Sequence, residues 1–449
     1  MFENIKFQWN IFTSTIVKLS LKVKFRPVIK SIFAKNSGLI MRWTLFIVFY
    51  ILIDIYAFQA IKTLSNSNWI YFGYLILSLL VLGNFIFQWS QPSPEGQFAG
   101  GRGYSMGLVI SFLIGKLILT LFMFGEDISR FLIAGYQNLV PPSGSSFSLS
   151  SRRLFLSQIA LGIAAIPFAS LLYGMYQGKY NYKVLKYSLY FEDLPDAFDG
   201  YRITQISDIH SGSFDNKKKI EYAIGLINEQ ESDTILFTGD LVNNLAAEMD
   251  PWISVFSKIE AKDGVFSILG NHDYGDYVSW ESDKARLDNV QAVKNVHSKM
   301  GWDLLLNEHR FIEKSGQRIA LVGVENWGSG GFKKLGDLDR AGKGLSPEEF
   351  KILLSHDPSY WQEKIKSDPN NYQLTLSGHT HGMQFGIEIP GWFKWSPIQY
   401  QYENWAGIYE EFGRYINVNR GFGYLAYPGR VGIWPEISVI ELRKRTKPA

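Results

Sequence analysis

The sequence contains no cysteine. Structural disulfides and thiolate-bound metal sites are therefore excluded, and any metal site must use histidine, carboxylate and amide ligands. Charged residues are also scarce, at 19% of the chain, whereas hydrophobic residues make up 46%. Such a composition favours membrane segments or a very large core. The net charge of +3 is too small to indicate a dominant basic surface, so nucleic acid is not expected as a partner.

The length of 449 residues predicts more than one structural unit. Residues 1–37 are basic, with a single acid, Glu3. This pattern is typical of an interfacial segment, although a poorly ordered tail or a start codon at Met41 would also explain it. Residues 38–178 are predicted to form a transmembrane region. In residues 184–445, short strand-like runs alternate with helical patterns, which predicts a separate α/β domain.

Four apolar stretches of about 20 residues predict transmembrane helices, because this length crosses the hydrocarbon core. They cover residues 43–60, 69–88, 104–124 and 154–176. Four buried core helices are the alternative. Asp54 and Lys116 are the charges inside these stretches, and we expect them to face the bundle interior, where they can pair.

The string Ser151-Arg152-Arg153-Leu154-Phe155-Leu156 precedes the fourth stretch and resembles a twin-arginine export signal. A working signal would place everything after residue 176 outside the cytoplasm. The basic N-terminal segment predicts the reverse, since an inner N-terminus followed by four crossings leaves the C-terminal part inside. The two signals conflict, and the complete string favours the extracytoplasmic side.

Short buried strands are predicted after residue 184, and each is followed by side chains of a type that binds metals. The strands cover residues 201–206, 234–238, 265–269, 350–354 and 372–376, and the side chains are Asp208, His210, Asp240, Asn271, His356, His379 and His381. Loops that leave the carboxyl ends of neighbouring strands converge on one crevice. We therefore expect these residues to form one site.

Spacing adds detail to this site. Asp208 and His210, like His379 and His381, are two residues apart, so in an extended chain each pair points the same way and can bind one ion. Seven nitrogen and oxygen ligands are too many for one ion and suit two, with Mn, Fe or Zn the expected metals. Two histidines, His297 and His309, fall outside the pattern and are expected to be structural or on the surface.

The motifs of this domain resemble those of the calcineurin-like metallophosphoesterases. They are Asp208-Ile209-His210, Gly239-Asp240, Gly270-Asn271-His272-Asp273, Ser355-His356 and Gly378-His379-Thr380-His381. The resemblance implies a four-layer α-β-β-α sandwich. Gly382-Met383-Gln384 and Pro435-Glu436-Ile437 resemble a membrane-associated bacterial branch that includes twin-arginine-exported phosphoesterases and UDP-2,3-diacylglucosamine hydrolases.

The resemblance also implies a role for each motif residue. Asp208, His210 and His381 would hold one metal, Asn271, His356 and His379 the other, and Asp240 would bridge them. His272, with Asp273 fixing its tautomer, would protonate the leaving oxygen. Outside these motifs, Arg420 follows a predicted strand at residues 415–418, and its planar guanidinium is expected to clamp a phosphate oxygen.

The predicted function is hydrolysis of phosphodiester or pyrophosphate bonds by a hydroxide that bridges two divalent metals. Four membrane spans favour a lipid-linked substrate, such as a UDP-diacylglucosamine-like molecule or a phospholipid, with the lipid bilayer as partner. A protein Ser/Thr phosphatase is one alternative. A transporter or sensor with a regulatory phosphoesterase domain is another, and the oligomeric state is not predicted.

Overall fold

The computed structural model describes residues 26–91, 100–139, 149–389 and 391–445. The chain divides into two compact units. One comprises Met1–Tyr71 with Lys116–Leu161, and the other comprises Phe72–Gly115 with Gly162–Ala449. Most of the predicted basic N-terminal segment, residues 1–25, lies outside the described residues. Helix α2 already includes the last part of that segment.

Four long helices precede the α/β domain: α2 (Arg26–Leu64), α3 (Asn68–Ser90), α4 (Gly100–Leu139) and α5 (Leu149–Tyr176). Each contains a stretch long and apolar enough to cross a membrane, namely Trp43–Leu64, Asn68–Ser90, Gly100–Gln137 and Arg152–Tyr176. The prediction of four spans is confirmed. Helix α4 continues well beyond the predicted end at residue 124, because its charged C-terminal part is held in ion pairs.

Those ion pairs lie within the first unit. Glu126 accepts a bond of 2.5 Å from Arg130 in the next turn of α4 and also pairs with Arg153 of α5 at 3.2 Å. Asp127 pairs with the same arginine at 2.7 Å. The second arginine of the export-like string therefore has a structural role in joining α4 and α5, whatever its role in targeting.

Asp54 and Lys116 also meet inside the first unit. The Lys116 ammonium lies 2.7 Å from Asp54 Oδ1 and 2.8 Å from the Tyr50 hydroxyl, and the Lys116 side chain is only 4% exposed. The expectation that these charges face inward and pair is confirmed. The pair joins α2 to α4, and each charge lowers the cost of placing the other in an apolar helix.

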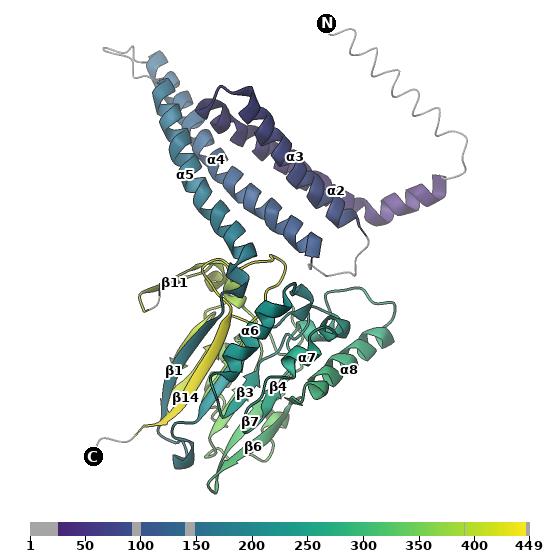
Figure 1. The fold of residues 1–449 in the computed structure, drawn as a ribbon, viewed down its shortest axis with the longest axis vertical. Helices are drawn as coiled ribbons and strands as arrows, with labels where there is room; N and C mark the ends of the chain where they lie inside the picture. The colour runs from purple at the N-terminus through teal and green to yellow at the C-terminus, as the bar shows by residue number, and fades with distance from the viewer. Residues whose placement is uncertain (1–25, 92–99, 140–148, 390, 446–449) are drawn as a thin grey trace. The chain divides into compact units, whose positions relative to one another are not determined.

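The α/β domain contains two six-stranded sheets (Figure 1). The first has the order β1 (Lys183–Phe191), β14 (Glu436–Lys444), β2 (Arg202–Ile206), β3 (Thr234–Phe237), β4 (Val265–Ser267) and β5 (Asp303–Leu304). The second has the order β12 (Gly407–Glu411), β13 (Arg414–Val418), β9 (Leu374–Ser377), β8 (Lys351–Leu354), β7 (Gln317–Gly323) and β6 (Glu308–Lys314). A separate hairpin consists of β10 (Ile387–Ile389) and β11 (Phe393–Trp395).

Three apolar cores separate the layers of this domain. The central core lies between the sheets and joins residues such as Leu236 of β3 to Leu354 of β8. The outer face of the first sheet packs against α6 (Lys217–Asn228), α7 (Ile253–Phe256) and α8 (Asp283–Lys299). The outer face of the second sheet packs against α9 (Leu338–Ala341) and α10 (Ser359–Glu363). The predicted four-layer α-β-β-α sandwich is confirmed.

Helix α6 illustrates how the sequence specifies a layer. Asn216 caps its N-terminus by accepting a 3.2 Å hydrogen bond from the amide of Lys219, as an N-cap asparagine should. Ile220, Ile224 and Ile227 are all buried against the first sheet. These isoleucines recur at helical spacing, so one face of the helix covers the sheet while the other stays in solvent.

His297 of α8 is one of the two histidines expected to be structural, and the structure buries it completely. Its Nδ1 lies 2.9 Å from the Ser267 hydroxyl, and burial lowers its pKa to about 3. The unfolded chain therefore takes up a proton below the ordinary pKa of about 6.5, whereas the folded chain does not. Stability is lost as the pH falls from about 6.5 towards 3.

We expect this loss to reach about 2 kcal/mol at pH 5, since each unit of pKa difference corresponds to roughly 1.4 kcal/mol. The measurement is the free energy of unfolding of the detergent-solubilised protein at pH 7 and pH 5, for the wild type and for His297→Gln. The variant should lose less stability on acidification than the wild type. Equal losses would contradict a neutral, buried His297.

Candidate metal centre

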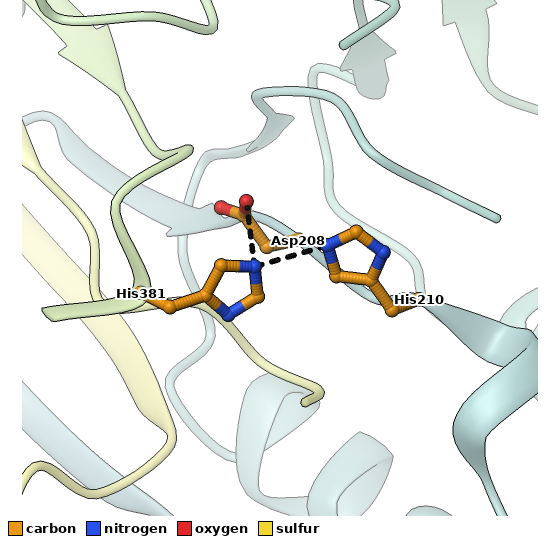
Figure 2. A group of neighbouring side chains, drawn as sticks. All are labelled: Asp208, His210 and His381. Atoms are coloured by element: carbon orange, nitrogen blue, oxygen red, sulfur yellow. Dashed lines mark hydrogen bonds and ion pairs between the residues drawn. The ribbon is translucent and has the colours of Figure 1, made fainter. Parts of the chain in front are cut away.

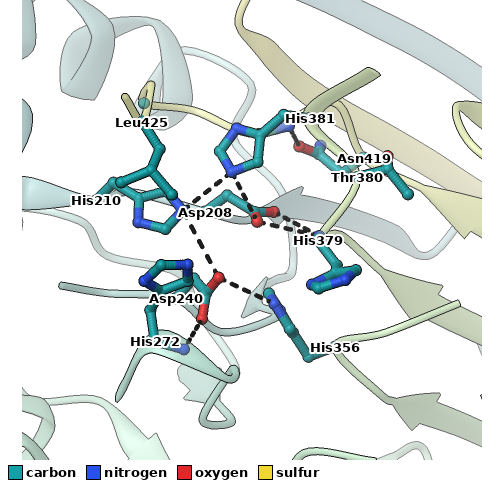
Figure 3. A network of polar contacts seen from close by, with 12 residues as sticks. Asp208, His210, Asp240, His272, His356, His379, Thr380, His381, Asn419 and Leu425 are labelled. Atoms are coloured by element: carbon teal, nitrogen blue, oxygen red, sulfur yellow. Dashed lines mark hydrogen bonds and ion pairs between the residues drawn. The ribbon is translucent and has the colours of Figure 1, made fainter. Parts of the chain in front are cut away.

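The ligand-type residues all follow strands at one edge of the two sheets. Strand β2 pairs in parallel with β3, and β3 with β4. In the second sheet, β8 pairs in parallel with β9. The carboxyl ends of these strands therefore point to the same edge, and Figure 3 shows the side chains that follow them facing one another. The predicted convergence of these residues is present in the structure.

Asp208, His210 and His381 form the first cluster (Figure 2). Nε2 of His210 lies 2.9 Å from Nε2 of His381, and the latter atom lies 3.2 Å from Asp208 Oδ1. All three side chains are buried. Burial by itself would raise the pKa of Asp208, but the nearby imidazole of His381 keeps that pKa below its ordinary value. The carboxylate is thus held in its charged form.

Asp240, His356 and His379 form the second cluster, and Asn271 lies among them. Asn271 Oδ1 is 3.1 Å from His356 Nε2 and 2.9 Å from His379 Nδ1. Asp240 Oδ2 is 3.1 Å from His356 Nε2. The same carboxylate oxygen is 3.6 Å from His210 Nε2 of the first cluster. Asp240 therefore lies between the two clusters.

The donor set fits a cation at the second cluster. His356 has its Nδ1 2.7 Å from the Thr238 carbonyl, so Nδ1 carries a proton. Burial lowers the pKa of His356, but the Asp240 carboxylate raises it to about 10, so a cation would take the place of the proton on Nε2. The Asn271 amide nitrogen donates to the Tyr277 hydroxyl at 2.8 Å, which turns Oδ1 toward the histidines. Acceptor atoms thus converge on one another, an arrangement that a shared positive ion stabilises.

The backbone at these residues is strained. Asp208, His210, Asp240, His379 and His381 all have left-handed φ angles, between 47° and 72°. Such a conformation costs a residue with a side chain on the order of 1–3 kcal/mol, and it concentrates at functional sites. The strand ends therefore turn sharply and aim each side chain inward, at the expense of local stability.

This conformation overturns one sequence-based expectation. Asp208 and His210 do share a cluster, but His379 and His381 do not. His381 joins the first cluster and His379 the second, which is the division that the family resemblance implied. The expectation that both pairs point one way assumed an extended chain. Because His379 and His381 are both left-handed, the alternation of an extended strand does not apply to them.

Asp273 does not contact the His272 ring as predicted. Its carboxylate accepts backbone amide bonds from Asp240, Leu241, Val242 and Gly270, at 2.8–3.2 Å. Burial and the charge of Asp240 raise the pKa of Asp273 to about 7, although these amides oppose the rise. The residue organises the turn that carries Asp240. The His272 ring instead places Nδ1 2.7 Å from the Asn243 carbonyl, and that carbonyl sets the tautomer.

Arg420 is held by two carboxylates. Its guanidinium lies 2.5 Å from Glu436 Oε2 and 2.5 Å from Glu388 Oε1, and its side chain is 5% exposed. Both terminal nitrogens are thus engaged in ion pairs. The prediction that Arg420 clamps a phosphate stays a prediction, and it requires one of these pairs to open.

Several residues around the site were missed by sequence reasoning. Nε2 of His379 lies 2.8 Å from the Tyr402 hydroxyl and 3.4 Å from Asp357 Oδ2. Arg430 is fully buried beside His381, with 3.2 Å between its Nη2 and the imidazole Nδ1. Asp357 follows His356 directly, which is a usable signal. Tyr402 and Arg430 lie in loops, and the sequence contains no pattern that would single them out.

Comparison with known proteins agrees with this geometry. Residues 201–383 match the family described as "Calcineurin-like phosphoesterase". Residues 41–179 match the family described as "Probable Calcineurin-like phosphoesterase, transmembrane domain". The two matches cover the region of the four helices and most of the strands that carry the site.

Three curated relatives are similar to this chain. The uncharacterized metallophosphoesterase YkuE of Bacillus subtilis is 30% identical over 56% of this chain and 82% of its own length. An uncharacterized metallophosphoesterase of Helicobacter pylori is 24% identical over 74% of this chain and 80% of its own length. The transmembrane protein with metallophosphoesterase domain of Danio rerio is 26% identical over 66% of this chain. The match spans 64% of the zebrafish protein's length, slightly less than two thirds.

With its four apolar helices and this domain, the chain belongs to the calcineurin-like phosphoesterases and is a membrane-associated phosphoric ester hydrolase.

Proposed function

We propose that this membrane-associated metallophosphoesterase hydrolyses phosphodiester or pyrophosphate bonds with the help of two divalent metal ions. Asp208, His210 and His381 would hold one ion, and Asn271, His356 and His379 the other. The observation that carries the proposal is the position of Asp240, whose Oδ2 faces His210 and His356 at 3.6 and 3.1 Å. A carboxylate in that position suits a bridge between two cations.

The metals, when bound, would contribute affinity for phosphate oxygens and a lowered pKa for a bound water. Mn, Fe and Zn suit the nitrogen and oxygen donors. The chain itself would supply proton transfer through His272, whose ring lies 4.9 Å from that of His210. Since its Nδ1 is engaged by the Asn243 carbonyl, Nε2 is the nitrogen available to a leaving oxygen.

Metal removal tests the proposal. The full-length protein, purified in detergent, should hydrolyse bis(4-nitrophenyl) phosphate, and dialysis against a chelator should lower the rate by more than about 100-fold. Adding Mn²⁺ to the stripped protein should restore the rate, and the metal content of the active protein should approach two ions per chain. Inactivity with Mn²⁺, Fe²⁺ and Zn²⁺ alike would contradict the proposed reaction.

The substrate is proposed to be lipid-linked, such as a phospholipid or a UDP-diacylglucosamine-like molecule. The support comes from the four membrane spans and from apolar side chains that the domain exposes around the β10–β11 hairpin, with Trp392 81% and Ile387 54% exposed. A protein phosphatase would have less use for either feature. Faster turnover of phosphopeptides than of phospholipid-like esters would favour the protein phosphatase instead.

The catalytic domain is proposed to lie on the extracytoplasmic side, on the strength of the twin-arginine string. Alkaline phosphatase folds into an active enzyme only after export, because it needs disulfides that form outside the cytoplasm. A fusion of this reporter after residue 180 should therefore be active. A second fusion between α3 and α4 serves as a control: two crossings separate the two points, so it lies on the same side and should be active as well. Inactive fusions at both points would place the domain in the cytoplasm.

A further inference from the structure

An apolar groove lies beside the last membrane helix, within the second unit of the chain. Its volume is about 750 Å³, in the range of a site for a sizeable organic ligand. One wall belongs to α5 and includes Ile166, Ala169 and Tyr173, and the other includes Phe385, Ile387 and Val431. We call this feature the membrane groove. Figure 1 shows the end of α5 beside the hairpin labelled β11.

The α5 wall belongs to a segment that is apolar enough to cross a membrane. Ile166 and Tyr173 both fall within the candidate span Arg152–Tyr176. At 1.5 Å per helical residue, Ile166 lies roughly 15 Å along the helix from Tyr176. The groove thus lies beside a candidate membrane span, where acyl chains would be the apolar molecules that surround it.

The two walls are held together closely. The Tyr427 hydroxyl donates to the Leu171 carbonyl at 2.5 Å, and the Arg430 amide donates to the Gly174 carbonyl at 3.3 Å. A side chain at Gly174 would overlap the Arg430 carbonyl, so glycine permits this approach of two backbones. These contacts between the two walls therefore fix the shape of the groove.

A second cavity, of about 540 Å³, adjoins the membrane groove and shares Glu388, Gly432 and Trp434 with it. Its lining includes the exposed Lys183 and Lys186. Among the described residues, no ion pair of 4 Å or less joins either lysine to a carboxylate. The lining also includes Arg420 with its two carboxylate partners, Glu388 and Glu436, so three cationic and two anionic side chains border the cavity. An apolar groove followed by a cavity whose lining is positive on balance matches an acyl chain followed by an anionic headgroup.

The groove also lies near the candidate metal centre. The Val431 amide donates to the Gln384 carbonyl at 2.8 Å, and Phe385 of the groove wall is separated from His381 by only three residues. That length of chain spans at most about 14 Å. A molecule held in the groove is therefore close to the segment that carries His381.

We propose that the membrane groove binds an acyl chain of an anionic membrane phospholipid, with the headgroup beside Lys183 and Lys186. Lipid binding is independent of catalysis. The further consequence, that acyl-bearing phosphoesters enter the site from the bilayer, rests on the proposed function. The class of substrate is then an anionic lipid that does not have to leave the membrane.

Photocrosslinking of the full-length protein in lipid nanodiscs tests this proposal. The probe is a phosphatidylglycerol with a photoreactive group in one acyl chain, and peptide mapping locates the label. We expect label on residues 166–173, 385–388 and 431–434. Ala169→Trp and Ile387→Trp, which fill the groove from opposite walls, should each lower that labelling by at least fivefold. Ala165→Trp, one turn away on the same helix and outside the groove lining, should leave it unchanged.

A second comparison tests the headgroup. Replacing Lys183 and Lys186 together by glutamine should remove a preference for the phosphatidylglycerol probe over a phosphatidylcholine probe. Thermal unfolding of each variant shows whether it is folded. Labelling that neither blocking variant lowers, or that spreads evenly over all spans, would overturn the proposal. Specific labelling of a protein without phosphoesterase activity would uphold the groove while contradicting the proposed function, so the two failures are distinguishable.

Discussion

Replacing Asp240 by asparagine is expected to lower kcat for a generic aryl phosphodiester by on the order of 1,000-fold, which corresponds to about 4 kcal/mol. Asparagine has nearly the same shape and keeps an oxygen for the His272 amide, which now donates to Asp240 Oδ1 at 2.8 Å. It lacks the negative charge that a bridge between two cations requires. The loss should therefore come from the metal centre and not from misfolding.

Two measurements separate these causes. Metal analysis of purified Asp240→Asn should find fewer than two ions per chain, and its thermal unfolding in the presence of chelator should resemble that of the wild type treated in the same way. Asp250→Asn is the matched control, because Asp250 is exposed and its substitution should change neither rate nor metal content. Full activity in Asp240→Asn would contradict the bridging role.

Replacing Arg430 by methionine is expected to destabilise the protein by roughly 3–5 kcal/mol, because it removes a buried charge from a network of acceptors. The guanidinium donates to the Gly423 carbonyl at 2.6 and 2.9 Å and to the Gly421 carbonyl at 3.2 Å. Burial lowers the pKa of Arg430 to about 10, so it remains charged at neutral pH. Its loss would leave the buried Gly423 carbonyl without these two bonds, whereas the Gly421 carbonyl would keep its 3.1 Å bond from the Glu436 amide.

Chemical denaturation of the detergent-solubilised protein measures this loss. Arg443→Met is the matched control, because that arginine is 40% exposed in its ion pairs and exposed pairs contribute at most about 1 kcal/mol. We also expect Arg430→Met to lower activity, since the residue borders His381. A variant as stable as the control would show that the loop from Gly421 to Gly429 holds its shape without the guanidinium.

The composition of the site could be predicted because each ligand-type residue follows a recognisable buried strand. Asp208 follows β2, Asp240 follows β3 and His356 follows β8, and parallel pairing brings such strand ends to one edge. The partition of the histidines was implied by the family resemblance but could not be predicted from the spacing of the residues. It depends on left-handed turns at His379 and His381, and the side-chain alternation of an extended strand gives the wrong direction for them.

Contacts between distant loops could not be predicted from the sequence either. The roles of Asp273 and Arg420 were inferred from short sequence strings. Their partners in the structure are backbone amides around Asp240 and two carboxylates, Glu388 and Glu436. A buried charge takes the partner that the fold brings within reach, and that partner can lie anywhere in the chain.

Three features could be read from the sequence: the four membrane spans, the alternation of strands and helices, and the identity of the side chains at the strand ends. Each of these follows from local hydrophobic periodicity or from a short motif. The family resemblance, and not the spacing of the residues, implied which histidine joins which cluster. Neither the sequence nor the resemblance indicated which carbonyl orients His272, or that α5 shares a groove with the domain; both came from the three-dimensional structure. These features depend on backbone turns and on packing between residues far apart in sequence, where hydrophobic periodicity contains no information.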